Sequence, residues 1–84
     1  MIEKFNGQNF ELWKLKMEDL LVDKEQWVVF DLDTKPIVML QEDWDKIDGK
    51  ARSTIHLCLS DSILLNVSRE DTAKKLWDTL RNLY

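Results

Sequence analysis

Apolar residues recur at helical spacing near the start of the chain. Steps of three and four residues place on one face Phe10, Trp13, Met17, Leu20 and Leu21. This period is typical of an amphipathic α-helix, and we predict one from Phe10 to Asp23. Asn9 directly precedes it, and an Asn side chain at that position can accept a hydrogen bond from an unpaired amide of the first turn.

Two later segments show the same period. The middle segment predicts the longest helix, with a bend allowed at Gly49, and its stripe consists of Leu40, Trp44, Ile47, Ala51, Ile55 and Cys58. The last stripe consists of Ala73, Leu76, Trp77, Leu80 and Tyr84. Ser68 and Asp71 precede this stripe with the spacing of a capping box, which predicts that Ser68 caps the last helix.

The segments between these helices are less regular. Residues 26–40 fit a short strand, a helical turn or an extended connector, and we favour an irregular connector that places Trp27 and Phe30 against the helices. The only proline, Pro36, disfavours helix at Lys35. The segment from Ile63 to Val67 predicts a short helical turn that closes the core. The predicted fold is all-α: a small orthogonal bundle of three main helices with one or two short turns, in a single domain over residues 1–84.

Composition supports this class and narrows the functions. Two Gly and one Pro are too few for a β-sandwich, while four Trp and three Phe can fill the core of a small domain. A net charge of −4 argues against non-specific nucleic-acid binding by this segment. With one cysteine and no apolar run long enough to span a bilayer, we expect no internal disulfide, no membrane contact and a cytoplasmic location.

Candidate chemistry is sparse. His56 and Cys58 are two residues apart on a predicted helix and point in different directions, so they cannot share a metal ion. The carboxylates of Asp43, Asp45 and Asp48 lack the loop pattern of a calcium site and suit a solvated helix face. No glycine-rich phosphate loop or nucleophile motif is present, and we predict no catalytic residue, no cofactor, no metal and no enzymatic activity.

Three aromatic residues are candidates for protein contacts. Trp27 lies outside the helical stripes, and Trp is enriched at binding hot spots; Phe30 accompanies it. Tyr84 continues the last stripe to the final residue, which suggests a segment of a longer helical region. Apolar surface exposed there would favour dimerisation or domain swapping.

Three strings along the chain resemble copia-type LTR-retrotransposon Gag polyproteins. The first is Phe5-Asn6-Gly7-Gln8-Asn9-Phe10-Glu11-Leu12-Trp13, followed by Met17 and Leu20-Leu21. The second consists of Trp44, Asp48, Ala51, Ile55 and Leu59. The third consists of Thr72-Ala73-Lys74, Trp77-Asp78, Leu80 and Tyr84. The core signature carried by the resemblance is Phe5, Phe10, Trp13, Met17, Trp44, Ile55, Trp77 and Leu80. Relatives place Ser or Asp before the middle helix, where this chain has Met39-Leu40.

The resemblance implies a structural role. It suggests the N-terminal part of a Gag capsid region, with a retroviral-capsid-like N-terminal lobe that self-associates into virus-like particles. The expected partner is therefore a second copy of the chain, and RNA is bound only by downstream regions that carry a zinc knuckle. The alternative is a domesticated Gag-derived domain that binds a peptide or a host protein.

Overall fold

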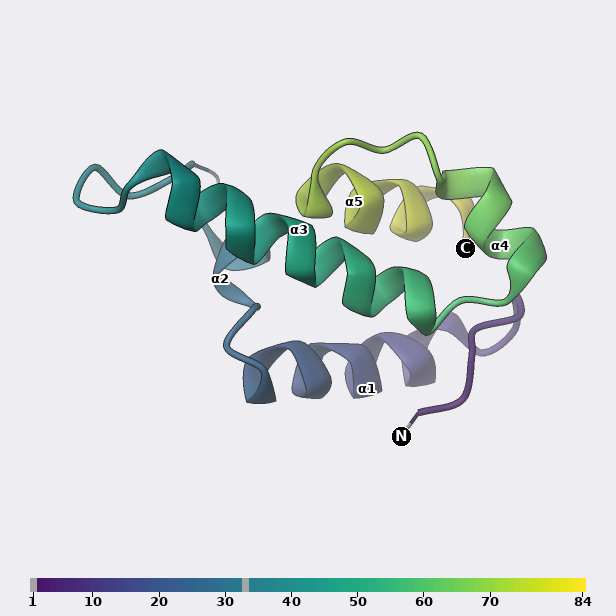
Figure 1. The fold of residues 1–84 in the computed structure, drawn as a ribbon. Helices are drawn as coiled ribbons and strands as arrows, with labels where there is room; N and C mark the ends of the chain where they lie inside the picture. Colours follow the sequence, from purple (N-terminus) through teal and green to yellow (C-terminus); the bar gives the residue numbers. More distant parts are fainter. Residues whose placement is uncertain (1, 33) are drawn as a thin grey trace.

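A computed structural model describes residues 2–32 and 34–84 of the chain. In this part the chain forms helices α1 (Phe10–Asp23), α2 (Val28–Asp31), α3 (Gln41–Leu57), α4 (Asp61–Val67) and α5 (Ala73–Leu83) (Figure 1). The described residues contain no strand, only one isolated bridge between Phe5 and Leu59. The all-α prediction is confirmed, with three long and two short helices. None of the described helices is both long and apolar enough to cross a bilayer.

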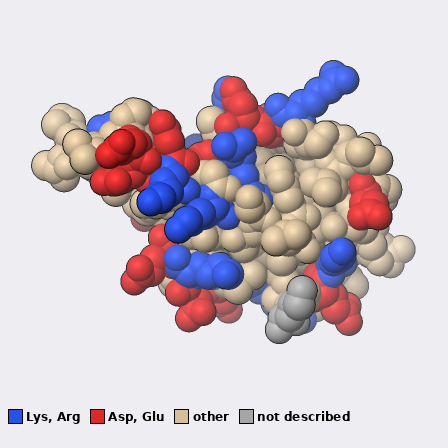
Figure 2. Space-filling model, viewed as in Figure 1, with Lys and Arg blue, Asp and Glu red and all other residues tan. Residues whose placement is uncertain are grey.

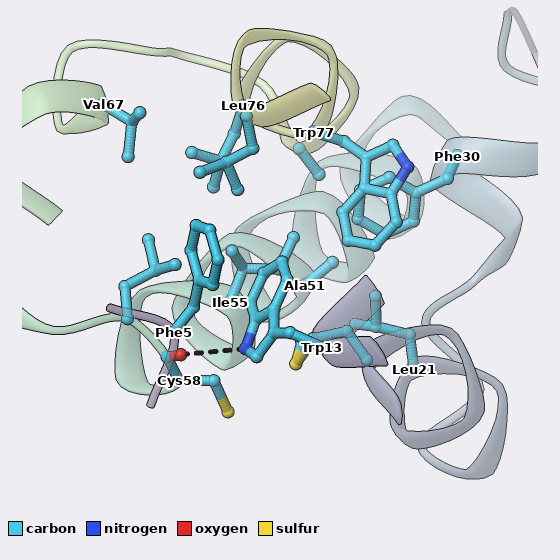
Figure 3. Close-up of a cluster of buried hydrophobic side chains, with 14 of the residues drawn as sticks. Phe5, Trp13, Leu21, Phe30, Ala51, Ile55, Cys58, Val67, Leu76 and Trp77 are labelled. Atoms are coloured by element: carbon cyan, nitrogen blue, oxygen red, sulfur yellow. Dashed lines mark hydrogen bonds between the residues drawn. The ribbon is translucent and has the colours of Figure 1, made fainter. Parts of the chain in front are cut away.

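The longest helix, α3, lies between α1 and α5 (Figure 1). The single turn of α2 contacts α3 and α5, and α4 packs on α5. The helices therefore enclose one apolar core, shown in part in Figure 3, whose fully buried large side chains are Met17, Leu21, Ile55, Leu59, Leu76, Leu80, Val29 and Val67. Each such side chain contributes about 1.5–3 kcal/mol when it leaves water, so this core is the main source of stability.

The segment before α1 is tied to the junction between α3 and α4. The amide of Phe5 donates to the carbonyl of Cys58 at 2.8 Å, and the amide of Ser60 donates to the carbonyl of Phe5 at 2.9 Å. The indole N–H of Trp13 donates to the same Cys58 carbonyl at 3.1 Å (Figure 3). Gly7 allows the following turn because its φ is +100°, a value that favours glycine.

The first helix has the predicted bounds, but the predicted cap is wrong. Asn9 adopts a left-handed backbone conformation (φ 56°, ψ 48°), and its side chain accepts no hydrogen bond from the first turn. A side-chain cap normally requires an extended backbone at the capping residue, which the turn at Gly7 and Asn9 does not provide.

The capping box predicted before α5 is also wrong. The Ser68 hydroxyl donates to the carbonyl of Leu65 at the end of α4. The capping residue is Thr72, whose extended backbone lets its hydroxyl oxygen accept from the amide of Lys75 at 3.1 Å. The helix therefore begins at Ala73, later than the capping-box spacing implies.

Residues 26–40 correct the expectation of an irregular connector. Residues 28–31 form the helical turn α2, in which Val29 and Phe30 are buried and the amides of Phe30 and Asp31 both donate to the carbonyl of Trp27. Gln26 is also buried, and its side-chain oxygen accepts from the Thr54 hydroxyl at 2.8 Å. The expected placement of Trp27 and Phe30 against the helices is confirmed.

The N-terminal end of the middle helix differs from the prediction made from its apolar stripe. It begins at Gln41, and Leu40 occupies the capping position without a side-chain hydrogen bond and with an exposed side chain. The helix runs without a break through Gly49 to Leu57. The short turn predicted at Ile63–Val67 is present as α4, with its first and last apolar residues buried and Leu65 exposed.

Candidate protein-interaction surfaces

Trp77 is the centre of an aromatic cluster that joins three helices. Its ring lies 6.1 Å from the ring of Trp13 on α1, 5.5 Å from Phe30 on α2 and 5.8 Å from Trp27 (centroid distances). Offset and edge-to-face pairs in this distance range add stability beyond the buried area. The cluster thus fixes α1 and α2 against α5.

A hollow opens beside this cluster, and we call it the aromatic hollow. It has a volume of about 220 Å³ and lies among Trp27, Phe30 and Trp77. Its rim carries three cations and two carboxylates: Lys14, Lys74, Arg81, Glu18 and Asp78. Trp27 is half-buried, stacks on Phe30 at a centroid distance of 5.2 Å and lines the hollow. Aromatic walls with a net positive rim suit an apolar group that carries a negative charge.

The structure separates the three residues predicted from the sequence to contact a partner. It brings Trp27 and Phe30 together in the aromatic hollow. Tyr84 follows α5, and its ring lies edge-on to Phe5 at 5.0 Å with part of its surface exposed. Tyr84 therefore closes the core beside Gly7 and belongs to no common surface with the other two.

The resemblance signature is mostly core. Its members Phe5, Trp13, Met17, Ile55, Trp77 and Leu80 are buried, whereas Phe10 and Trp44 are half-buried at the edge. Most of the signature residues therefore serve the packing of the core.

Sequence reasoning missed an exposed apolar turn before α3. We call residues 36–40 the apolar turn. The side chains of Ile37, Val38 and Leu40 are 98%, 95% and 62% exposed. Two β-branched residues directly after Pro36, in a turn where polar residues are usual, are the signal that could have found it.

A second missed feature is the outer face of α1. Leu12, Leu15 and Val22 are more than half exposed, opposite the stripe that faces the core. Next to Leu12 is a hollow of about 150 Å³, which we call the basic hollow. Its charged residues are Glu3, Lys4 and Lys16, and the rest of its lining consists of Phe5, Asn6, Gln8, Asn9, Leu12 and Trp13.

Two titratable side chains near the α3–α4 junction, Cys58 and His56, have shifted pKa values. Burial raises the pKa of the Cys58 thiol, with smaller opposing effects from Lys24 and Lys4. Burial, followed by the nearby Arg52 charge, lowers the pKa of His56. Among the described residues, no three His, Cys, Asp or Glu side chains gather where they could hold a metal ion.

Asp48 joins two helices. Its Oδ1 accepts from the amide of Ala73, the first residue of α5, at 3.0 Å, and its Oδ2 accepts from Nε of Arg52 at 3.1 Å. The prediction of a solvated carboxylate is therefore wrong for Asp48, because the helix start supplies an unpaired amide that must be satisfied inside the protein. Asp43 and Asp45 are exposed, as predicted.

This chain is a small all-α domain with exposed apolar groups outside a well-formed core. The sequence model of the gag-polypeptide of LTR copia-type matches residues 17–84. The chain is also similar to the retrovirus-related Pol polyprotein from transposon TNT 1-94 of Nicotiana tabacum, with 44% identity over 85 aligned positions. That match covers 99% of this chain and 6% of the relative's length. No solved structure matches. The chain belongs to the copia-type Gag family and is a Gag-like segment of the kind found in a retrotransposon polyprotein.

Proposed function

We propose that this chain is a capsid-building segment of a copia-type retrotransposon Gag, whose copies self-associate into virus-like particles in the cytoplasm. The observation that carries the proposal is the match to the copia-type Gag family over residues 17–84. The segment acts as a structural part and performs no chemical step. With a net charge of −4, it leaves RNA binding to other regions of the polyprotein.

The surface of the molecule supports this proposal. Exposed apolar side chains are grouped in the apolar turn and along the outer face of α1, and contiguous groups of this kind mark contact sites on proteins. Each group is small, so a contact between two copies is weak. Many weak contacts acting together can hold a shell, because neighbouring copies raise the effective concentration of one another.

The test uses a longer Gag chain that includes this segment. Light scattering and electron microscopy of the purified protein are expected to show particles, and the same chain without residues 1–84 is the matched control. Monomers at high concentration for the longer chain, or equally regular particles from the control, would contradict the proposal.

A second candidate function is peptide binding by a domesticated Gag domain, which the aromatic hollow favours. An acidic peptide with an apolar anchor would fit its aromatic walls and cationic rim. Titration with a peptide array is expected to change tryptophan fluorescence in the wild-type chain and not in Trp27→Ala. If no peptide binds while the chain clearly self-assembles, this second function is wrong.

A further inference from the structure

The apolar turn is held in one conformation while its side chains point into solvent. The amide of Met39 donates to the carbonyl of Pro36 at 3.0 Å. The ammonium group of Lys35 donates to the carbonyls of Pro36 and Met39, at 3.1 and 2.6 Å. The turn is therefore a fixed projection that presents Ile37 and Val38.

The residues of this turn violate local preferences without a local gain. Polar residues and glycine are preferred in turns, yet Ile37 and Val38 occupy this one. A Ser, Thr, Asp or Asn cap would stabilise α3, yet Leu40 stands at the capping position and makes no side-chain bond. Positions that break local rules in this way are expected at functional sites.

The basic hollow offers a matching surface on the same chain. Its volume of about 150 Å³ is similar to that of a cavity that accommodates benzene, so it has room for one aliphatic side chain. Leu12 is the exposed apolar side chain of its lining, beside the polar side chains of Asn6, Gln8 and Asn9, while Phe5 and Trp13 are 2% and 5% exposed. Lys4 and Lys16 are exposed at its rim, and no ion pair within residues 2–32 and 34–84 engages either lysine.

The charges around the two surfaces are complementary. Asp and Glu side chains gather beside the apolar tip at the left of Figure 2, with Lys and Arg side chains next to them, and the first turn of α3 contributes Glu42 and Asp43. The nearest lysine in the sequence, Lys35, is engaged by carbonyl groups of the turn. An acidic rim opposes docking on an anionic membrane and favours a partner whose rim has a positive net charge. The basic hollow carries Lys4 and Lys16 beside Glu3 on its rim, and Leu12 in its wall can contact an apolar side chain.

We propose that the apolar turn of one copy inserts into the basic hollow of a second copy, an inference that rests on the self-association proposed above. The turn lies at one end of the long dimension of the molecule, which measures 39 Å, and the start of α1 lies toward the other end (Figure 1). Two different surfaces at opposite ends make a head-to-tail contact, which extends into rings or open arrays. Ile37 fills the hollow, and Glu42 and Asp43 approach Lys4 and Lys16.

Sedimentation of the 84-residue chain over a range of concentrations tests this contact. The turn variant is Ile37→Ser with Val38→Ser, and the hollow variant is Lys4→Glu with Lys16→Glu. Both change exposed residues, and circular dichroism checks that each variant stays folded. Leu65→Ser is the matched control, because Leu65 is 76% exposed on α4 and belongs to neither surface.

The wild type and the control are expected to associate with rising concentration. Each variant is expected to associate about tenfold to a hundredfold more weakly. An equimolar mixture of the two variants restores one intact contact, so it is expected to form one-to-one dimers and nothing larger. Added salt is expected to weaken the wild-type contact, since the rim charges are exposed.

Several results would overturn the contact. If the wild type and both variants associate equally, copies meet through another surface, and the Gag assembly proposal still stands. A mixture that remains monomeric excludes the head-to-tail arrangement. Binding of neutral phosphatidylcholine vesicles by the wild type and not by the turn variant assigns the turn to a membrane instead. If neither this chain nor the longer Gag chain associates, both proposals fail.

Discussion

Replacing Asp48 by Ala tests how much one side chain contributes to the stability of the contact between α3 and α5. Asp48 is 9% exposed, and its carboxylate accepts from the buried first amide of α5. Its second bond goes to Arg52, whose side chain is one-third exposed. Removing the carboxylate leaves the amide of Ala73 without a partner inside the protein and removes a negative charge from the positive end of α5.

The expected magnitude follows from these contacts. An unsatisfied buried amide costs about 1–3 kcal/mol, and the lost charge at the helix start costs about 0.3–1 kcal/mol more. The partly exposed Arg52 pair adds at most about 1 kcal/mol. Ala regains about 0.5 kcal/mol as a better helix former. We expect Asp48→Ala to lower the free energy of unfolding by about 2–3 kcal/mol, a large fraction of the stability of a domain this small.

Thermal and urea unfolding followed by circular dichroism measure this loss. A change of about 2–3 kcal/mol corresponds to a fall in Tm of about 8–20 °C for a domain of this size. Asp48→Asn keeps a side-chain oxygen and is expected to lose about half as much. Asp45→Ala is the matched control: Asp45 lies on the same helix, is exposed, accepts a side-chain hydrogen bond from Gln41, and gains the same helix propensity on replacement. Equal stability of Asp48→Ala and Asp45→Ala would refute the reasoning.

Three further predictions concern stability. Thr72→Ala is expected to lower the free energy of unfolding by about 1 kcal/mol in urea, because it removes the hydrogen bond to the Lys75 amide. Ser68→Ala is expected to lower it by less than about 0.5 kcal/mol, and a larger loss for Ser68→Ala than for Thr72→Ala would indicate that Ser68 is the capping residue after all. Trp77→Ala is expected to cost about 3–5 kcal/mol and to flatten the thermal transition, and a native-like Tm would contradict the central role of the cluster. The raised pKa of the Cys58 thiol means that the folded state keeps its proton at pH values where the unfolded state has lost it. Its contribution is therefore full below the ordinary pKa of 9.0 and falls as pH rises beyond it; urea unfolding between pH 8 and 10.5 is expected to decline less steeply for Cys58→Ala.

The helix and core predictions succeeded where the information is local. The stripe beginning at Phe10 gave a helix with the observed bounds, and the stripe around Trp77 gave the buried face of α5. A helical period arises from residues three and four apart, so each stripe can be read without knowing its neighbours. Burial of Cys58 followed from the same reasoning.

The candidate surfaces were harder to predict because they depend on which chemical groups meet across the fold. The sequence indicated Trp27 and Phe30 but not the cations of α1 and α5 beside them. The exposure of the apolar turn was also hidden, since an apolar run such as Ile37–Val38 usually indicates burial.

By itself, then, the sequence determined the all-α class, the three long helices and the resemblance to copia-type Gag proteins. Tertiary structure decided where α5 begins, because Asp48 reaches across 25 positions to its first amide. It also decided how the N-terminus is held, because the Trp13 indole bonds a carbonyl 45 positions away. The helical period and the composition of a segment show which of its side chains can be buried. Caps, turns and surfaces depend on unpaired backbone groups and open space that exist only once distant segments have packed.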